Sequence, residues 1–393
     1  MMLRKDHWET LTLEELCEIS VGSTPLRKNK DFWVNGTIPW FTIDDIRESG
    51  RIIRNTKQKI TERALRETSL RLLPPETVLL CCTASLGEYA ISKITITTNQ
   101  QFIGLIMKDD RKIIPEYLFH YVSTLKNKLH ELSGKTTIDF VPIYRIKNLE
   151  IPLPSIEEQK QIASLFQSIE TAAELVEGQE KNLAILKKQL LKDLFGSSNK
   201  FGNSLTKQDF EPVKFEKLAN NISERVEPKE TDLDIYVVLE HLDPDCLTIE
   251  RTGKPEDVIG TKLKIYKSDI IFGKRRAYLR KVAVSHFDGI ASAHSMIMRA
   301  NENNIEKDFL PYFMQSDTFM ERAIQISEGS LSPTIKWKTL AAQEFVIPTK
   351  MKQPKLVEVF RQFDSTTQLL KQQKSTLKTL KQNLLDEILA NVI

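Results

Sequence analysis

Apolar side chains recur at alternating spacings of three and four residues along two long stretches of the chain. Within 151–196 they are Ile162, Leu165, Ile169, Ala172, Val176, Leu183, Leu186, Leu190 and Leu194. Within 349–393 they are Val359, Phe363, Leu370, Leu377, Leu380, Leu384 and Ile388. This spacing places side chains on one face of an α-helix, so it predicts two helices of roughly 60 Å at ~1.5 Å per residue. A stripe this narrow is typical of long helices that pair with one another.

The two helical stretches begin alike. Each follows an Ile-Pro step, at Ile151 and at Ile347. After the first step, Ser155 and Glu158 have the spacing of a capping box, which predicts that the helix begins there. Gly196 stands where a helix C-terminal cap is expected.

A shift of 194 residues aligns the two stretches. It pairs Phe166 with Phe360 and Lys187 with Lys381. Weaker similarity continues upstream, where "PEYLFHYV" from Pro115 resembles "KDFLPYFM" from 307. The repeated unit is therefore a globular segment followed by a long helix. A period this long excludes solenoid repeats and indicates two homologous halves.

A glutamine interrupts each apolar stripe at the same place. These residues are Gln179 and Gln373. We expect them to be buried, to face each other across an antiparallel helix pair and to bond amide to amide, which would fix the register of the helices. The alternative is that the two helices are unrelated and dock on separate cores.

The remaining segments are rich in short β-type runs such as "TVLLCC" and "KVAVSHF", with helices expected near 114–132 and 306–326. This mixture predicts an α+β fold. We divide the chain into a first globular domain, a first helix, a polar linker, a second globular domain and a second helix. Their ranges are 1–150, 151–196, 197–209, 210–348 and 349–393.

Composition and motifs argue against several classes of protein. The four cysteines fit neither a disulfide framework nor a zinc site, and we expect them to be buried thiols. "SGKTT" from Ser133 lacks the first glycine of a phosphate-binding loop, and no cofactor or metal motif is present. No apolar run is long enough to span a bilayer and no signal peptide is evident, so a cytoplasmic protein is expected. We expect no catalytic residues, no metal and no cofactor.

Net charge is only +3, but positive charge is concentrated locally. Between Thr261 and Lys281, eight basic residues accompany a single acid, Asp269. The segment "GKRRAY" between two strand-like runs is expected to be a loop. Candidate DNA contacts in this half are Lys274, Arg275, Arg276, Tyr278 and Lys336. Arginine can bind guanine through two hydrogen bonds and lysine can hold phosphates, although a solvated basic face remains the alternative.

The corresponding loop in the first half, "CCTASLGEYA", is polar rather than basic. Candidate DNA contacts there are Asn99, Gln100, Gln101, Lys135, Thr136 and Thr137. Their amides can read adenine edges, and lysine and threonine can bind phosphates. Two unlike surfaces on two similar scaffolds suggest two different DNA half-sites.

Several motifs together carry a family resemblance. They are "GSTP" from Gly22, "DFWVNGTIPWFTIDDI" from Asp31, "LEIPLPSIEEQKQIASLF" from Leu149 and "SDIIFGKRRAYLRKVA" from Ser268. Over nearly its full length the chain resembles the specificity (S) subunit of type I restriction–modification systems. The resemblance implies two target-recognition domains separated by two long antiparallel helices that form a coiled coil with pseudo-twofold symmetry.

The resemblance also implies a non-catalytic subunit with defined partners. Each domain would read half of a bipartite site in double-stranded DNA. Two modification (M) subunits would supply methyl transfer, and restriction (R) subunits would supply translocation and cleavage. The alternatives are a stand-alone methyltransferase or nuclease with fused specificity domains, and a non-enzymatic orphan DNA-binding regulator. The absence of cofactor and metal motifs weighs against the enzyme alternative.

Overall fold

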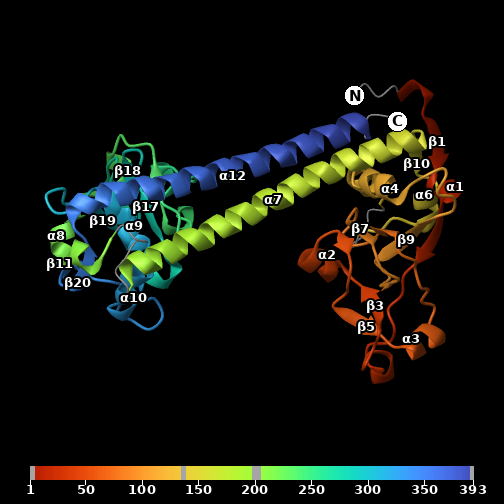
Figure 1. Cartoon of the computed structure of the whole chain (residues 1–393), viewed down its shortest axis with the longest axis horizontal. Helices are drawn as coiled ribbons and strands as arrows, with labels where there is room; N and C mark the ends of the chain where they lie inside the picture. The colour runs from red at the N-terminus through yellow and green to blue at the C-terminus, as the bar shows by residue number, and fades with distance from the viewer. Residues whose placement is uncertain (1–4, 134–138, 197–204, 390–393) are drawn as a thin grey trace. The chain divides into compact units, whose positions relative to one another are not determined.

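A computed structural model describes residues 5–133, 139–196 and 205–389. The chain forms two compact units, one made of Met1–Val176 with Gln373–Ile393 and the other of Glu177–Gln372. Each unit contains a globular part together with a segment of both long helices (Figure 1).

The globular part of the first unit is built on a five-stranded sheet, a three-stranded sheet and a two-stranded ladder. The spatial order in the five-stranded sheet is β2 (Cys17–Val21), β9 (Phe102–Met107), β6 (Val78–Cys81), β7 (Tyr89–Ser92) and β4 (Ile52–Ile53). The order in the three-stranded sheet is β5 (Gln58–Ile60), β3 (Ile38–Phe41) and β8 (Thr97–Thr98). The two-stranded ladder pairs β1 (Glu9–Thr12) with β10 (Glu150–Leu153). The helices are α1 (Leu13–Leu16), α2 (Ile43–Ser49), α3 (Glu62–Glu67), α4 (Pro115–Val122), α5 (Lys126–Leu132) and α6 (Ile143–Lys147).

The second unit has two four-stranded sheets and a two-stranded ladder. The spatial order in the first four-stranded sheet is β12 (Ala219–Ile222), β19 (Met296–Ala300), β16 (Ile270–Phe272) and β17 (Val282–Val284). The order in the second is β13 (Arg225–Val226), β15 (Lys262–Ile265), β18 (Gly289–Ala291) and β14 (Tyr236–Val237). The two-stranded ladder pairs β11 (Phe210–Lys214) with β20 (Glu344–Pro348). The helices are α8 (Phe215–Leu218), α9 (Phe309–Gln315), α10 (Asp317–Gln325) and α11 (Trp337–Ala341).

The two globular parts share one arrangement of elements. The antiparallel order β2–β9–β6–β7 in the first unit matches β12–β19–β16–β17 in the second. In both units a short parallel pair follows, β3 with β8 and β14 with β18. The predicted α+β class and the two homologous halves are confirmed.

Each Ile-Pro step lies in a β-strand that precedes its long helix. Pro152 lies in β10, which pairs antiparallel with β1, and Pro348 lies in β20, which pairs antiparallel with β11. The carbonyl oxygen of Pro152 accepts a hydrogen bond of 2.6 Å from the hydroxyl of Tyr117 on α4. Proline is tolerated because each ladder has only two strands, so the missing N–H can face away from the partner strand.

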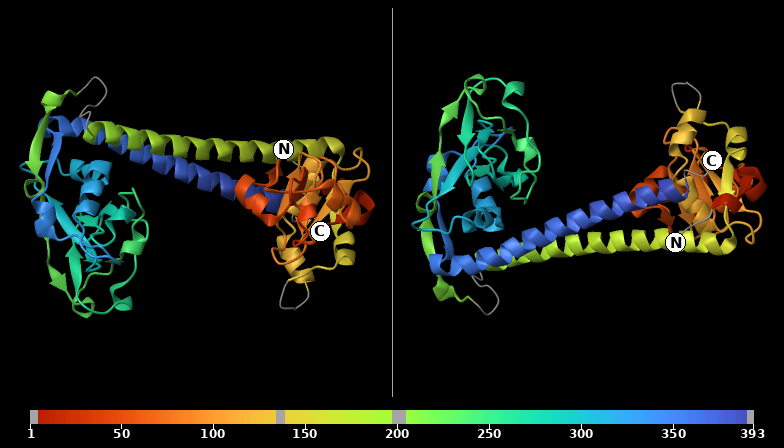
Figure 2. Two further views of the ribbon diagram at one scale, coloured as in Figure 1. Left: turned by 90° about the horizontal axis from the view of Figure 1, so that it is seen from below. Right: turned by 90° about the horizontal axis from the view of Figure 1, so that it is seen from above.

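The two long helices are α7 (Ile156–Phe195) and α12 (Gln353–Ile388). The capping box is confirmed, because the amide and hydroxyl of Ser155 both donate to Glu158 and the amide of Glu158 donates to the Ser155 hydroxyl. In the first unit the start of α7 shares a core with the end of α12 through Phe166 and Ile388. In the second unit the end of α7 shares a core with the start of α12 through Leu194 and Phe360. The paired segments therefore run antiparallel in each unit (Figure 2).

The expected burial of Gln179 and Gln373 is wrong. Both side chains are exposed, so neither needs an amide partner to avoid an unsatisfied buried group. Leu175 and Leu369, which the 194-residue shift also pairs, are each 64% exposed. A two-helix pair covers only a narrow face of each helix, so much of the apolar pattern stays in contact with solvent.

The glutamines that the helices do bury lie at their first turns. Gln159 and Gln353 are also 194 residues apart, and both are fully buried. Gln159 accepts from the amide of Ile114 at 3.0 Å and donates to the carbonyl of Pro154 at 2.9 Å. Gln353 accepts from the amide of Glu306 at 2.7 Å and likewise donates to a proline carbonyl at 2.9 Å. The first turn of each long helix is thus bonded to the globular part of the unit that contains it through a buried glutamine side chain.

Candidate nucleic-acid interface

The basic loop of the second unit connects β16 to β17. It contains one 3-10 turn, Ala277–Leu279, and its backbone is bonded to a second loop. The amide of Arg276 donates to the carbonyl of Pro333 at 2.8 Å, and the amide of Ile335 donates to the carbonyl of Lys274 at 3.0 Å. The loop prediction is confirmed, and these bonds hold the basic residues against 328–336.

Two side chains that the sequence did not single out hold the arginines. Nη2 of Arg275 donates to the hydroxyl of Ser332 at 3.1 Å, and Nη2 of Arg276 lies 3.4 Å from the same hydroxyl. Nη1 of Arg275 lies 3.2 Å from Nε2 of His294. Partial burial and the charge of Arg275 lower the pKa of His294, which favours a neutral ring that can accept this hydrogen bond. The two guanidinium groups are therefore directed to the same side by a shared partner.

The other predicted residues of this half lie around the arginines. Burial, with Arg225 nearby, lowers the pKa of Lys274, and the ring of Tyr278 is 52% exposed. Lys336 is exposed and forms an ion pair of 2.6 Å with Glu328. The structure thus gathers all five predicted side chains on two joined loops. Whether they contact DNA remains a prediction.

One arginine of the basic run has a structural role. Nε of Arg280 lies 2.7 Å from Asp245, and Nη1 lies 3.0 Å from Asp317. A third bond of 2.6 Å runs from Nη2 to the carbonyl of Gln315. Because its donors are taken up by these partners, Arg280 fixes the end of the loop and contributes little net positive charge to the surface.

The first unit repeats this backbone frame with different side chains. The amide of Ala84 donates to the carbonyl of Asp139 at 2.9 Å, and the amide of Val141 donates to the carbonyl of Cys82 at 3.0 Å. Ala84 has φ of 61°, in the same left-handed region as Arg276 at 56°. The frame is the same, but the loop 82–88 contains no basic residue. The predicted contacts Lys135, Thr136 and Thr137 lie outside the described residues.

The amide residues of the first half lie beside this loop. Asn99 is buried and holds a turn, accepting from the amide of Gln101 at 3.1 Å and donating to its side-chain oxygen at 3.0 Å. The carbonyl of Gln101 accepts from the amide of Cys82 at 3.0 Å. Gln100 is exposed and bonds to the hydroxyl of Thr24. Of the three predicted residues, Gln100 is the one best placed to contact a ligand.

The cysteines and acids of the described residues form no metal site. Cys17, Cys81 and Cys82 are buried and free, as predicted, whereas Cys246 is only partly buried. Burial raises the pKa of the Cys17 thiol to about 12, which keeps it protonated and unreactive. Across the described ranges, no three His, Cys, Asp or Glu side chains are grouped closely enough to hold a metal ion. Among the helices described, none is both long and apolar enough to cross a membrane.

Most of the chain matches the model of a known protein family. The family model for the type I restriction modification DNA specificity domain matches residues 5–187 and 235–379. The chain belongs to this family. Its two matched segments correspond to the two globular parts, each with long-helix residues, so it carries the specificity domain twice.

Curated members of the specificity-domain family are similar in sequence. The MjaIX specificity subunit of Methanocaldococcus jannaschii is 36% identical over 217 residues, which cover 54% of this chain and 47% of the relative. The EcoprrI specificity subunit of Escherichia coli is 32% identical over 148 residues, covering 37% of this chain and 36% of the relative. These two matches span about half or less of the relatives' lengths. The MjaVIII specificity subunit is 21% identical over 408 residues, covering 99% of this chain and 93% of the relative.

Solved structures share the fold. A specificity subunit of a type I restriction–modification system from M. genitalium has a TM-score of 0.59 at 15% identity, with 99% of this chain and 98% of that chain covered. A chain from a study of assembly and conformational transition in a type I system has a TM-score of 0.63 at 17% identity, with 97% of each chain covered. The specificity-domain fold is thus shared across nearly the whole chain.

Proposed function

We propose that this protein is the DNA-reading subunit of a type I restriction–modification enzyme and that each unit reads one half of a bipartite duplex site. One observation carries the proposal. The same backbone frame presents Arg275 and Arg276 in one unit and, in the other, a loop without basic residues that has Gln100 beside it. Two copies of one scaffold with different surface chemistry suit two different DNA sequences.

The chemistry of the two surfaces suggests what each half can recognise. Arg275 and Arg276 can donate to the O6 and N7 atoms of guanine in the major groove or to phosphates. Gln100 can donate to and accept from the adenine edge. A guanine-containing second half-site and an adenine-containing first half-site follow from this difference.

The proposed subunit acts through partners and has no catalytic activity of its own. Two M subunits would transfer the methyl group, and R subunits would translocate and cleave DNA. The family membership and the likeness to a chain from a type I assembly support this arrangement. The complex would act in the cytoplasm, on double-stranded DNA.

The direct test is a methyl-transfer assay with the purified full chain. The chain alone, with duplex DNA and S-adenosylmethionine, is expected to transfer no methyl groups. Addition of M subunits is expected to produce methylation confined to one bipartite sequence. Methyl transfer by the isolated chain would contradict the proposal in favour of a stand-alone enzyme. DNA binding without any association with M subunits would favour an orphan regulator.

A further inference from the structure

The first unit carries a second cationic surface, on the loop between β2 and β3. This loop, residues 22–37, exposes Arg27, Lys28 and Lys30 within four positions. Among the described residues, none of the three has an ion-pair partner. Their charge is therefore available to an anionic ligand, unlike that of Arg280 in the second unit.

Arg27 is held in a corner made by two tryptophans. Its guanidinium carbon lies 4.0 Å from the ring centroid of Trp33 and 4.5 Å from that of Trp40. The two indoles are nearly perpendicular, at 86°, with centroids 5.0 Å apart. Nη1 of Arg27 also donates to the side-chain oxygen of Gln58. Cation–π attraction orients the group without neutralising it, so Arg27 keeps its positive charge and its remaining N–H donors for a ligand.

The indoles also fix the loop backbone. Nε1 of Trp33 donates to the carbonyl of Leu26 at 3.2 Å, and Nε1 of Trp40 donates to the carbonyl of Ser23 at 3.0 Å. The loop therefore has a defined conformation before any ligand arrives. A preformed cationic loop loses less conformational entropy on binding than a mobile one.

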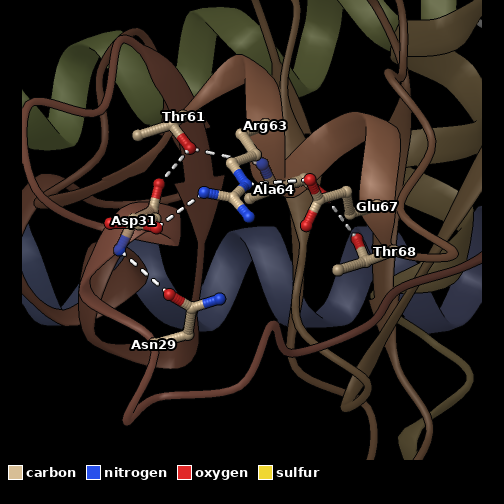
Figure 3. Close-up of polar contacts among 7 residues, drawn as sticks. All are labelled: Asn29, Asp31, Thr61, Arg63, Ala64, Glu67 and Thr68. Carbon is tan, nitrogen blue, oxygen red and sulfur yellow. Dashed lines mark hydrogen bonds and ion pairs between the residues drawn. The ribbon is translucent and has the colours of Figure 1, made fainter.

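The far end of the loop is anchored to α3, as Figure 3 shows. The side-chain oxygen of Asn29 accepts from the amide of Asp31 at 3.1 Å, and the hydroxyl of Thr61 donates to the carbonyl of Asp31 at 2.7 Å. Arg63 lies 2.6 Å from Asp31 and 2.8 Å from Glu67. Arg63 is thus neutralised by two carboxylates, unlike Arg27, Lys28 and Lys30.

The near end of the loop joins the candidate interface. The amide of Ser23 donates to the carbonyl of Thr98 at 2.9 Å, and the hydroxyl of Thr24 bonds to Gln100. A Cβ at Gly22 would lie 2.0 Å from the carbonyl oxygen of Asn99, so the close approach requires glycine. The cationic loop and the exposed amide of Gln100 are therefore parts of one surface.

The corresponding segment of the second unit has the opposite charge. Residues 223–235 follow β12 as 22–37 follow β2. Their five acids, Glu224, Glu227, Glu230, Asp232 and Asp234, outnumber the two bases, Arg225 and Lys229. Glu224 is paired with Lys264 at 2.9 Å. The second unit thus has a basic β16–β17 loop and a net acidic segment at this place, whereas the first unit has cations on this segment and no basic residue on its β6–β7 loop.

We propose that the loop 22–37 is the phosphate-binding element of the first unit, with Arg27, Lys28 and Lys30 contacting the DNA backbone of the first half-site. This proposal rests on the proposed DNA-reading function. Phosphate contacts position a protein on duplex DNA, while base contacts give specificity. The loop would hold the backbone while Gln100, joined to it through Thr24, faces the bases.

The test compares the salt dependence of DNA binding by full-length variants. Removing one phosphate-binding cation should reduce the slope of log K against log salt by about 0.9. K28A/K30A is therefore expected to lower the slope by about 1.8, weakening binding to every DNA sequence alike at low salt. K28R/K30R is expected to keep the parent slope. K229A/K254A removes two exposed lysines from the second unit and serves as the matched control with an unchanged slope.

A parent-like slope for K28A/K30A would overturn the proposal. Melting temperature provides the folding control, because both lysines are exposed and their replacement should leave it unchanged. R275A distinguishes failure of the loop proposal from failure of the proposed DNA-reading function. If R275A alters DNA binding and K28A/K30A does not, the loop proposal fails and the DNA-reading function stands. If the parent chain binds no DNA under any condition, both fail.

Discussion

Nζ of Lys187 on α7 lies 2.5 Å from Oδ1 of Asp364 on α12, within the second unit. The first unit contains the matching pair, Lys381 with Glu170, also at 2.5 Å. Each residue is 194 positions from its counterpart in the other pair. Lys187 is only 14% exposed, and Asp364 also accepts from the hydroxyl of Tyr312 at 2.7 Å. These two ion pairs join the helices at a defined position within each unit.

Breaking the pair from one side should destabilise the second unit. K187M leaves the partly buried Asp364 carboxylate without its cation, and we expect a loss of about 1–3 kcal/mol, between the values for exposed and buried pairs. The exchanged variant K187D/D364K should recover much of that loss. The free energy of unfolding in denaturant measures both effects, with K188M at the neighbouring exposed lysine as control. If the loss of unfolding free energy in the exchanged variant equals the sum of the losses in its two single variants, direct pairing would be contradicted.

The buried glutamines should matter more than the exposed ones. Q353A removes the acceptor for the amide of Glu306 and the donor to Pro348, so it should lower the free energy of unfolding by about 1–3 kcal/mol. Q159A should do the same in the first unit. Q373A, at an exposed glutamine of the same helix, should change it by less than about 0.5 kcal/mol. Equal losses for Q353A and Q373A would contradict this assignment.

Acid should destabilise the first unit through His120. Its ring is buried, and burial together with Lys381 lowers its pKa to about 3. Between pH 6.5 and about 3 the unfolded chain binds a proton at this site that the folded chain does not, so stability falls as pH falls through this window. One such proton contributes a slope of at most about 1.4 kcal/mol per pH unit. In H120F the acid dependence of unfolding should be shallower by this amount, and an unchanged slope would contradict it.

The basic loop should govern the second half-site only. R275A and R276A should each cost about 1–3 kcal/mol of binding if the side chain reads a base, with preference relaxed in that half. S332A keeps both arginines but removes the hydroxyl that they share, so it should relax base preference in the same half-site to a smaller extent. Binding to libraries randomised in one half at a time measures this. Variants with the parent's preference in both halves would show that the loop does not read DNA.

Much of the fold could be predicted from local pattern. The apolar spacing and the capping box located α7, which begins at Ile156, and the 194-residue shift revealed the duplication. The strands at the Ile-Pro steps were missed because proline argues against a strand, although a two-stranded ladder tolerates it. The burial of Gln179 and Gln373 was misjudged because periodicity shows which residues share a helix face but not how much of that face a partner covers.

The candidate site was predictable only in part. A run of basic residues between two strands located Lys274, Arg275 and Arg276. His294 and Ser332 meet Arg275 from distant parts of the chain, and no local spacing links them to it. The loop 22–37 was overlooked because its net charge is modest in sequence. Only the fold shows that two indoles hold Arg27 and that the loop lies beside Gln100.

Reading of one half-site by each unit can be tested in cells. The most direct measurement is the methylated motif found by whole-genome modification sequencing of cells that carry this chain with its M subunits. Segment 8–150 would be exchanged for that of a relative with a different specificity. The expected motif has one half replaced, the other half retained and the spacer length unchanged. A change in both halves, or in neither, would contradict it.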